Sequence, residues 1–230
     1  MGERPWTVLS CSTSLDGYLD AGTAERLVLS GEEDLARVDA VRASCDAILV
    51  GAGTVRADDP RLLVRDPAAR RRRLAGGLPE HPVKVTVTAS GDLDPGGRFF
   101  SHGDGTKLVY CDTGVVDRTR DRLGGAATVV DAGSPFGLRD VLGDLAARGI
   151  ARLMVEGGGR VLTQLLVAGL ADELHLVVAP FFVGDPGASR FVGAGAFPWD
   201  AAHRASLVEA RPVGDVVLMR YDLAGSGCRR

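Results

Sequence analysis

The sequence predicts an α/β protein whose central sheet is mainly parallel. Short apolar or β-branched runs alternate with amphipathic stretches through most of the chain, and strands separated by helices pair in parallel. Near the C-terminus two alternating runs follow one another across a turn, which predicts an antiparallel pair at the edge of the sheet. The composition, with 45% hydrophobic and 25% charged residues in 230, is that of a globular chain.

The first expected elements are a strand and a helix. The strand covers residues 6–14 and ends at Ser14-Leu-Asp-Gly17, a turn sequence. Ser30 and Glu33 have the spacing of a capping box, in which two side chains satisfy backbone N–H groups at the start of a helix. Apolar residues then recur at helical spacing, so we expect this helix to reach about Ala43.

The remaining elements continue the alternation and place helices on both faces of the sheet. Further strands are expected at residues 46–50, 83–88, 107–111, 127–130, 153–155 and 172–179. Helices are expected at 138–148, stopped by Gly149, and from the glycines after residue 155 to about residue 168. The antiparallel strands are 205–210 and 216–221, joined by a turn at 212–214.

Charge and cysteine content exclude several classes of protein. The net charge of −3 indicates no surface for a nucleic acid or another polyanion. Arginines 70–73 lie in a stretch, 66–80, that we interpret as a solvated loop, the alternative being a phosphate clamp. None of the four cysteines forms a C-x-x-C pair, so we expect no metal or dithiol site and place Cys11, Cys45 and Cys111 in the core.

The sequence shows no targeting or membrane segment. A strand follows Met1 almost directly, and no apolar run reaches the length of a transmembrane helix. We therefore expect a cytoplasmic protein without a membrane partner. Residues 224–230 are expected to form a frayed tail.

The most informative stretch is the strand, turn and helix over residues 152–166. An apolar run precedes three glycines at 157–159, and apolar residues at helical spacing follow them. The free N–H groups and dipole of such a helix terminus attract phosphate, and glycines let a diphosphate touch the backbone. Glu156 stands where the strand ends, at the rim where α/β proteins bind ligands. A tight connection without a ligand is the alternative.

A second candidate site follows the strand at residues 46–50. Two glycines there permit close approach of a ligand, and Thr54 offers a hydroxyl to a phosphate or a nucleotide amide. Asp58 and Asp59 precede Pro60, which moves Asp59 out of helical geometry and ends the turn. The fingerprint G-x-G-x-x-G is not matched, and an Asp-Asp-Pro sequence also serves as a simple cap and turn.

Taken in order, these segments resemble the pyrimidine reductase domain of riboflavin biosynthesis. The collinear motifs are Ser14-Leu-Asp-Gly17, Arg42 with residues 46–62, residues 156–159, and residues 169–174 with Ala179-Pro180. The resemblance covers about residues 6–222 and implies one domain, 1–230, of dihydrofolate-reductase-like fold, with three α/β/α layers and antiparallel C-terminal edge strands. No H-x-E…P-C-x-x-C deaminase pattern is present, so the chain is similar to the stand-alone reductases.

The resemblance implies a hydride transfer. NADPH would reduce the ribose C1′ of a 5-phosphoribosylamino-pyrimidine to give the ribitylamino product. The carbonyl or imine form of the opened sugar would accept the hydride, while the protein aligns the nicotinamide and excludes water. The expected partner is therefore a small phosphorylated pyrimidine. Relatives of this fold also suggest a homodimer, for which 172–179 and Pro180-Phe-Phe-Val183 are the candidate surface, the alternative being that these residues belong to the core.

The resemblance also assigns site residues by motif position. The candidate NADPH-binding residues are Ser12, Thr54, Asp58, Ser90, Gly157, Gly158, Gly159, Arg160, Val161, Leu162, Thr163 and Gln164. The candidate substrate-binding residues are Arg42, Leu62, Arg65 and Glu156, the arginines being suited to a phosphate. Glu156 and Asp58 are the candidate catalytic carboxylates. Alternatives stay open: Arg42 lies where a cation favours a helix C-terminus, Arg65 in an ordinary loop, and Asp16 shapes its turn.

Two departures from the family pattern bear on the substrate. Ser10 stands where relatives often have a lysine that could polarise the sugar carbonyl, and Val28 where a tryptophan is common. The general acid, the exact substrate and the choice of NADPH over NADH therefore stay open. A reductase of a dihydropterin or another small metabolite is one alternative, with Asp46 or Glu156 holding the ring, and a non-catalytic nucleotide-binding module is another.

Overall fold

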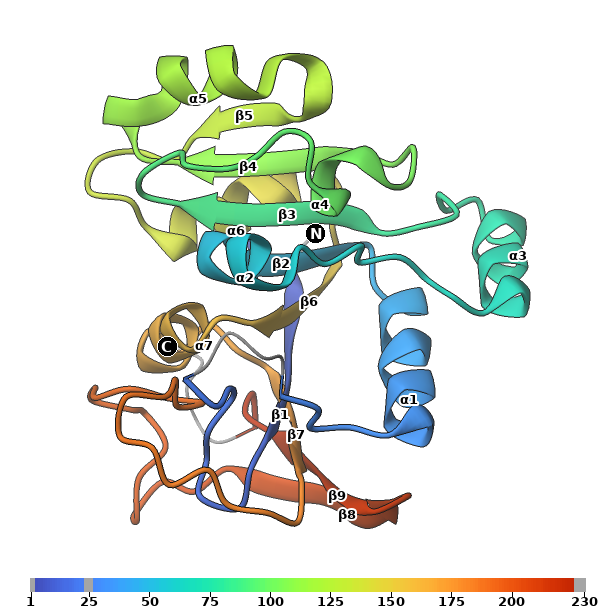
Figure 1. Cartoon of the computed structure of the whole chain (residues 1–230), viewed down its shortest axis with the longest axis vertical. Helices are drawn as coiled ribbons and strands as arrows, with labels where there is room; N and C mark the ends of the chain where they lie inside the picture. Colours follow the sequence, from blue (N-terminus) through green and yellow to red (C-terminus); the bar gives the residue numbers. More distant parts are fainter. Residues whose placement is uncertain (1–2, 23–26, 226–230) are drawn as a thin grey trace. The chain divides into compact units, whose positions relative to one another are not determined.

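The computed structural model describes residues 3–22 and 27–225 (Figure 1). The chain divides into two compact units. The first unit comprises Met1–Trp6 and Asp39–Met154, and the second comprises Thr7–Val38 and Val155–Arg230. Helix α1 (Glu32–Ala43) and strand β6 (Arg152–Gly157) contribute residues to both units. A single domain over residues 1–230 stays a prediction.

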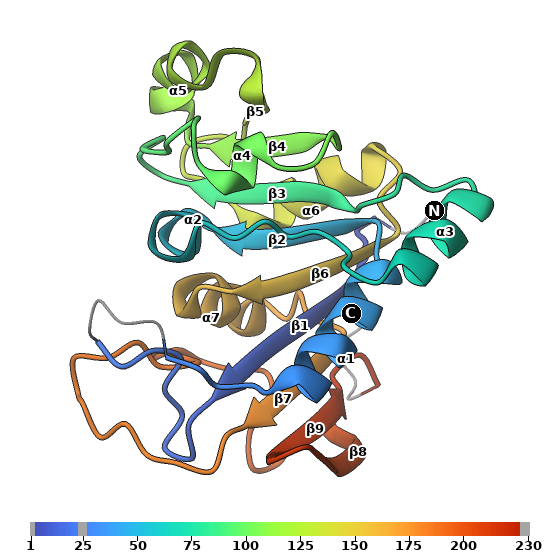
Figure 2. The same ribbon diagram turned by 45° about the vertical axis from the view of Figure 1, so that its right-hand side comes forward.

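The first unit is built on a parallel sheet. Its strands are β2 (Ala47–Gly51), β3 (Val83–Thr88), β4 (Lys107–Cys111) and β5 (Thr128–Asp131), in the order β5-β4-β3-β2. Each strand runs parallel to its neighbour, and Figure 2 shows β2, β3 and β4 with their arrowheads at one end. Ile48, Val85 and Val109 are fully buried, as the β-branched runs predict. The four predicted strands are confirmed.

In the described part of the first unit five α-helices accompany this sheet besides the end of α1, and the sequence predicted one of the five. They are α2 (Ala52–Asp58), α3 (Pro67–Ala75), α4 (Arg98–Ser101), α5 (Val116–Leu123) and α6 (Leu138–Ala147). Helix α6 confirms the prediction, because it ends one residue before Arg148 and Gly149 follows with φ +88°. The other four have nine residues or fewer, too few for a clear helical period, and tertiary contacts stabilise them.

The interpretation of residues 66–80 as a solvated loop was wrong. Asp66 caps α3 by accepting hydrogen bonds from the N–H groups of Ala68 and Ala69, and Pro67 occupies the first helical position. Arg73 in the last turn is only 3% exposed and donates to the carbonyl oxygens of Ala43, Cys45 and Pro79. The last arginine of the run therefore has a structural role as a buried hydrogen-bond donor, whereas Arg71 and Arg72 are exposed.

The second unit contains a mixed sheet. Its strands are β1 (Trp6–Thr13), β7 (Glu173–Val178), β9 (Val216–Asp222) and β8 (Ser206–Val213), in that order. β1 and β7 are parallel, whereas β9 is antiparallel to both β7 and β8. This arrangement confirms the predicted C-terminal antiparallel pair. One face is closed by Val177, Val213 and Leu218, against which Leu29 and Phe181 pack.

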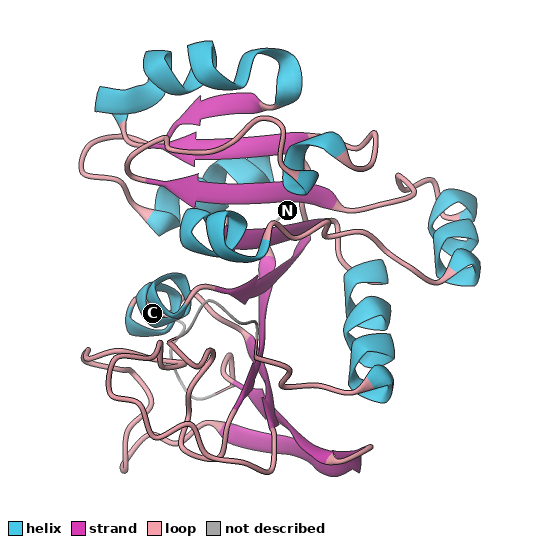
Figure 3. Cartoon of the chain, viewed as in Figure 1, coloured by secondary structure: helices cyan, strands magenta, loops and turns pink. Residues whose placement is uncertain are grey.

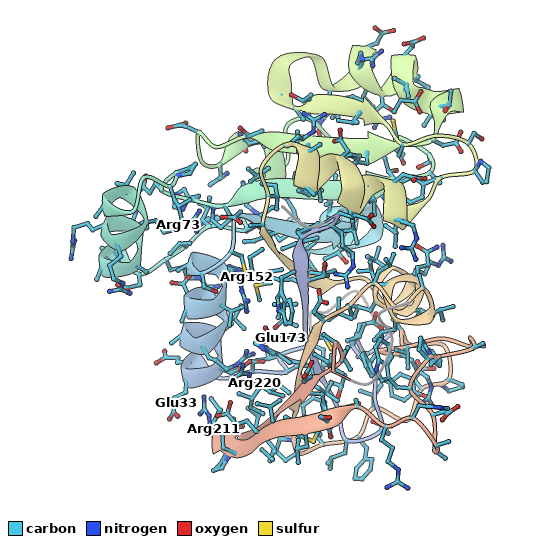
Figure 4. The ribbon with its side chains drawn as sticks, turned by 180° about the vertical axis from the view of Figure 1, so that it is seen from behind. Glu33, Arg73, Arg152, Glu173, Arg211 and Arg220 are labelled. Carbon is cyan, nitrogen blue, oxygen red and sulfur yellow. The ribbon has the colours of Figure 1, made fainter. Side chains whose placement is uncertain are left out.

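One face of β7, β9 and β8 also carries a charged row. Arg220 on β9 lies between Glu173 and Glu209, with Nη2–Oε2 and Nη1–Oε2 distances of 3.5 and 3.1 Å. Figure 4 labels Arg220 and Glu173. His175, 4% exposed, lies opposite Arg220 and accepts a hydrogen bond from its Nε at 3.2 Å. These cross-strand contacts favour the observed register of the antiparallel strands. A one-residue slip of one strand would turn its charged side chains to the opposite face of the sheet and break the contacts.

Two local predictions in this unit were wrong. Helix α1 begins at Glu32, so Gly31 rather than Ser30 occupies the capping position; the Oγ atoms of Ser30 and Ser12 are hydrogen-bonded at 2.9 Å instead. Glu33 accepts a hydrogen bond from the N–H of Gly214 instead of completing a capping box. The final turn lies after β8 ends at Val213, because β8 is an edge strand and tolerates Pro212 within it.

The cysteines behave as core residues. Cys11, Cys45 and Cys111 are buried free thiols, as predicted, and burial raises the pKa of Cys11 to about 12. Cys228 and the rest of residues 226–230, part of the expected tail, lie outside the described residues. Within the ranges that the structure describes, no helix has both the length and the apolar character needed to cross a membrane.

Candidate functional site

The turn between β6 and α7 (Gly159–Val167) presents free backbone donors. Gly157 and Gly158 have φ values of +147° and +86°, which L side chains rarely adopt, and Gly158 is the helix cap. The N–H groups of Val161 and Leu162 donate to the Gly158 carbonyl. Among the described residues, the N–H groups of Gly159 and Arg160 have no acceptor. This helix terminus therefore offers donors and a positive dipole end to an anion.

The same turn also has a packing role. A Cβ on Gly159 would collide with the carbonyl oxygen of Arg190. The Thr163 hydroxyl donates to the Gly159 carbonyl at 2.6 Å and accepts from the N–H of Gly193 at 2.9 Å. The long loop between β7 and β8, which Figure 3 shows, is thus fastened to α7. Both interpretations of the glycines apply, since they support a tight connection and leave donors free.

Side chains in the helix differ in their availability to a ligand. Val161 and Leu162 are 6% and 0% exposed, so they could contact a cofactor only through the backbone. Thr163 already uses its hydroxyl within the protein. Arg160 and Gln164 are exposed. The guanidinium of Arg160 has no partner among the described residues and stands at the positive end of the helix dipole, where an anion would stabilise it.

Arg190 connects this turn to the Ser14–Gly17 turn, and no motif in the sequence predicts this role. Its Nη2 donates to the Tyr18 hydroxyl at 2.8 Å, its Nη1 donates to the Asp16 carbonyl, and its guanidinium lies 4.4 Å from the Tyr18 ring centroid. Asp16 accepts from the N–H groups of Val183 and Gly184. Desolvation opposes ionisation of Asp16, but these hydrogen bonds and one from Ser14 lower its pKa to about 2. Asp16 shapes its turn, as predicted.

Two further candidates belong to the second unit. Ser12 is half-buried near the end of β1, and its hydroxyl is hydrogen-bonded to that of Ser30 at 2.9 Å. Glu156 is half-buried near the end of β6. Both therefore lie near the carboxyl-terminal ends of their strands, and α/β proteins bind ligands at this end of the strands.

In the first unit, α2 carries Thr54 and Asp58. Thr54 is half-buried in the first turn, Asp58 is exposed in the last, and neither side chain has a partner among the described residues. The adjacent Asp59 has left-handed geometry, with φ 42°, and accepts from the Phe99 N–H and Arg98 Nε at 3.1 and 3.2 Å. Burial opposes ionisation of Asp59, but these hydrogen bonds lower its pKa. Asp59 is the structural member of the pair, and Asp58 is available to a ligand.

Ser90 follows β3, which is the parallel neighbour of β2. Thr54 and Ser90 therefore lie at the same edge of the first unit's sheet, beyond the ends of adjacent strands. Ser90 is exposed, and its Oγ accepts a weak hydrogen bond from the Asp92 N–H at 3.3 Å. Its carbonyl accepts from Arg118.

The candidate substrate residues of the first unit meet at the last turn of α1. Arg42 is half-buried and donates from Nη1 to the Leu63 carbonyl at 3.3 Å. Arg65 is exposed, and its guanidinium has no partner among the described residues. Leu62 is only 2% exposed with φ 48°, so a substrate could reach it only through the backbone. The structure thus brings Arg42 to the backbone of the segment that carries Arg65.

Asp46 has a structural role at the start of β2. Its Oδ2 accepts hydrogen bonds from the N–H groups of Ala151 and Arg152 at 2.9 and 2.8 Å. These bonds fasten the start of β6. One oxygen of this carboxylate is therefore already used within the protein. In the part of the chain that the structure describes, no group of three His, Cys, Asp or Glu residues is arranged to hold a metal ion.

Comparison with known proteins gives the family. Residues 5–219 match the model of the RibD C-terminal domain. The chain is 33% identical over 223 residues to the 2,5-diamino-6-ribosylamino-4(3H)-pyrimidinone 5′-phosphate reductase of Methanothermobacter thermautotrophicus, covering 96% of this chain and 100% of that one. It is 34% identical to the Archaeoglobus fulgidus reductase of the same name, covering 79% and 83%. A Corynebacterium diphtheriae pyrimidine reductase-like protein has the same fold, with TM-score 0.81, 23% identity and coverage of 95% and 91%.

Proposed function

Because this chain belongs to the RibD C-terminal domain family, we propose that it reduces a phosphoribosylamino-pyrimidine of riboflavin biosynthesis with NADPH as hydride donor. The product would carry a ribityl chain. The free N–H donors at the start of α7 are the observation that supports a dinucleotide most directly, because such a terminus binds anions and the diphosphate is the anionic group of a dinucleotide that can approach the backbone. The two relatives at 33% and 34% identity bear the diamino-pyrimidinone name, which favours a substrate that keeps its 2-amino group.

We assign the candidate residues the following roles toward the cofactor. When bound, NADPH would supply the hydride. The backbone of residues 158–160 would donate to the diphosphate, and Arg160 would add a positive charge that also suits the 2′-phosphate of NADPH. Thr54 and Ser90 would donate hydroxyl hydrogen bonds, and Asp58 would accept one. Ser12 would lie by the nicotinamide. The exposed side chain of Gln164 would be available to the cofactor, and Val161, Leu162 and Thr163 would shape the helix whose N-terminus binds it.

The substrate assignment rests on charge. Arg65 is an exposed cation without a partner among the described residues and would bind the 5′-phosphate, together with Arg42, which contacts the same segment at the Leu63 carbonyl. Leu62 would contribute its backbone. Glu156 would accept hydrogen bonds from the sugar hydroxyls or assist the proton transfer to the opened ribose. Asp58 is the second candidate carboxylate for that proton step. Ser10 is 5% exposed and supplies no lysine-like cation.

The test is a steady-state assay of NADPH oxidation. We expect turnover with the diamino-pyrimidinone 5′-phosphate and slower turnover with the corresponding amino-uracil. No turnover with either, combined with reduction of dihydrofolate, would assign the chain to pterin chemistry. Tight NADPH binding without turnover on any of the three would leave a nucleotide-binding module.

Arg65→Ala is expected to raise the KM for the phosphorylated pyrimidine about tenfold or more, because a charge-assisted hydrogen bond of this kind contributes about 1.5–3 kcal/mol. The KM for NADPH should change much less. Arg61→Ala, an exposed arginine four residues earlier, is the matched control and should change neither value. A larger effect on the NADPH KM than on the substrate KM would move Arg65 to the cofactor.

We also propose that the protein forms homodimers through the edge of the second unit's sheet. β8 is the last strand of that sheet, and Leu207, Val208 and Val217 are 58%, 59% and 45% exposed. The surface expected from the sequence lies partly inside the fold, since Leu174 and Val177 are 9% and 0% exposed, although Phe182 is 73% exposed. Sedimentation velocity of the purified protein tests the proposal, and a monomer at micromolar concentration would exclude it.

A further inference from the structure

Asp39 is a buried acid whose carboxylate is fully used by two successive peptide groups. It lies on α1 with 5% of its surface exposed. Its Oδ1 accepts from the N–H of Arg65 at 2.7 Å, and its Oδ2 accepts from the N–H of Asp66 at 2.8 Å. Because both bonds are charge-assisted and arise from one planar group, they fix the orientation of the backbone at Arg65.

Neighbouring contacts anchor the same segment at further points. Three residues along α1, Arg42 donates to the Leu63 carbonyl at 3.3 Å. Leu62 is 2% exposed and holds a left-handed backbone conformation, and the N–H of Val64 donates to His81 Nδ1. The backbone from 62 to 66 is therefore fixed, whereas the guanidinium of Arg65 is exposed and without a partner among the described residues. A fixed backbone that carries a free cationic side chain is typical of a pre-organised binding residue.

We propose that Asp39 is a positioning residue for the substrate phosphate. It holds the Arg65 backbone in the direction from which the guanidinium meets the phosphate, without touching the substrate itself. The inference rests on the proposed role of Arg65 and deepens it. The chemical group recognised is a phosphate monoester on a pentose, and the effect of Asp39 should therefore appear in phosphate affinity rather than in the hydride step.

A purely structural role for Asp39 is the competing explanation. Asp66 caps α3, so the loss of Asp39 could act through that helix and lower stability without affecting ligand binding. Asp46 provides a matched control, because its carboxylate also accepts from two successive peptide N–H groups in the first unit, those of Ala151 and Arg152. Asp39→Ala and Asp46→Ala remove the same type of contact, and only the first borders Arg65.

The experiment measures binding of ribose 5-phosphate by calorimetry, with thermal unfolding in parallel. We expect both alanine variants to lower the Tm, but only Asp39→Ala to weaken ribose 5-phosphate binding, by about tenfold. In the assay its KM for the pyrimidine should rise with kcat nearly unchanged. In an Arg65→Ala background, Asp39→Ala should have almost no further effect on the Kd, because the two residues act on one contact.

Asp39→Asn serves if Asp39→Ala does not fold. The amide keeps the shape but presents one acceptor and one donor to two N–H groups, so an intermediate loss of affinity is expected. Equal effects of Asp39→Ala and Asp46→Ala on the Kd, or additive effects of Asp39→Ala and Arg65→Ala, would overturn the positioning role. Wild-type protein that binds ribose 5-phosphate but does not reduce the pyrimidine would overturn the proposed function. The effect of Asp39 on phosphate binding could still be measured in that case. Wild-type protein that does not bind ribose 5-phosphate would overturn both.

Discussion

Gly158→Val is expected to abolish measurable NADPH binding at concentrations that saturate the wild type. A β-branched side chain at the cap of α7 would occupy the space in front of the free N–H groups, and a diphosphate could not approach the backbone. We expect the Kd to rise at least about a hundredfold, because several charge-assisted hydrogen bonds are lost together. Fluorescence titration of NADPH measures the change.

Backbone strain must be separated from this effect, because Gly158 has φ +86°. Gly149→Val is the matched control, since Gly149 has φ +88° and a Cβ there would meet no atom within 4 Å. Both variants should lose stability, by about 1–2 kcal/mol, from the left-handed conformation. Only Gly158→Val should lose the cofactor. A folded Gly158→Val protein with wild-type NADPH affinity would remove the start of α7 from the site.

Arg73→Met is expected to have the largest effect on stability. The side chain of Arg73 is 3% exposed and donates at 2.7–2.9 Å to the carbonyl oxygens of Ala43, Cys45 and Pro79. Methionine fills similar volume but leaves these acceptors without a donor. Each buried unsatisfied group costs about 1–3 kcal/mol, so we expect the free energy of unfolding to fall by about 3–5 kcal/mol after relaxation.

Urea denaturation measures this change. Arg71→Met and Arg72→Met are the controls on the same helix, because both side chains are exposed; they should stay within about 0.5 kcal/mol of wild type. The same result for Arg73→Met would mean that its three carbonyl contacts do not stabilise the fold.

The reason that Arg73 could not be identified in the sequence is general. Four consecutive arginines have the same composition whether they lie in solvent or on a helix, and only the packing of α3 turns one of them inward. The same holds for Asp58 and Asp59. Their order in the chain does not say which carboxylate meets Phe99 N–H and Arg98, since those residues lie about forty positions away.

The sequence by itself determined the parallel strands, the C-terminal antiparallel pair and helix α6. It also determined strand β6 with the glycine turn and helix α7 that follow it. Each depends on local information, namely the period of apolar residues and the conformational freedom of glycine, which neighbours in the chain decide. It also determined family membership, because the motifs are long and collinear. The tertiary structure alone decided which polar groups are used internally: Asp46, Asp59, Thr163 and Arg73 have partners distant in sequence, and Asp39 holds the backbone of Arg65. Hydrogen bonds between distant segments depend on how the whole chain packs, and no local pattern records them.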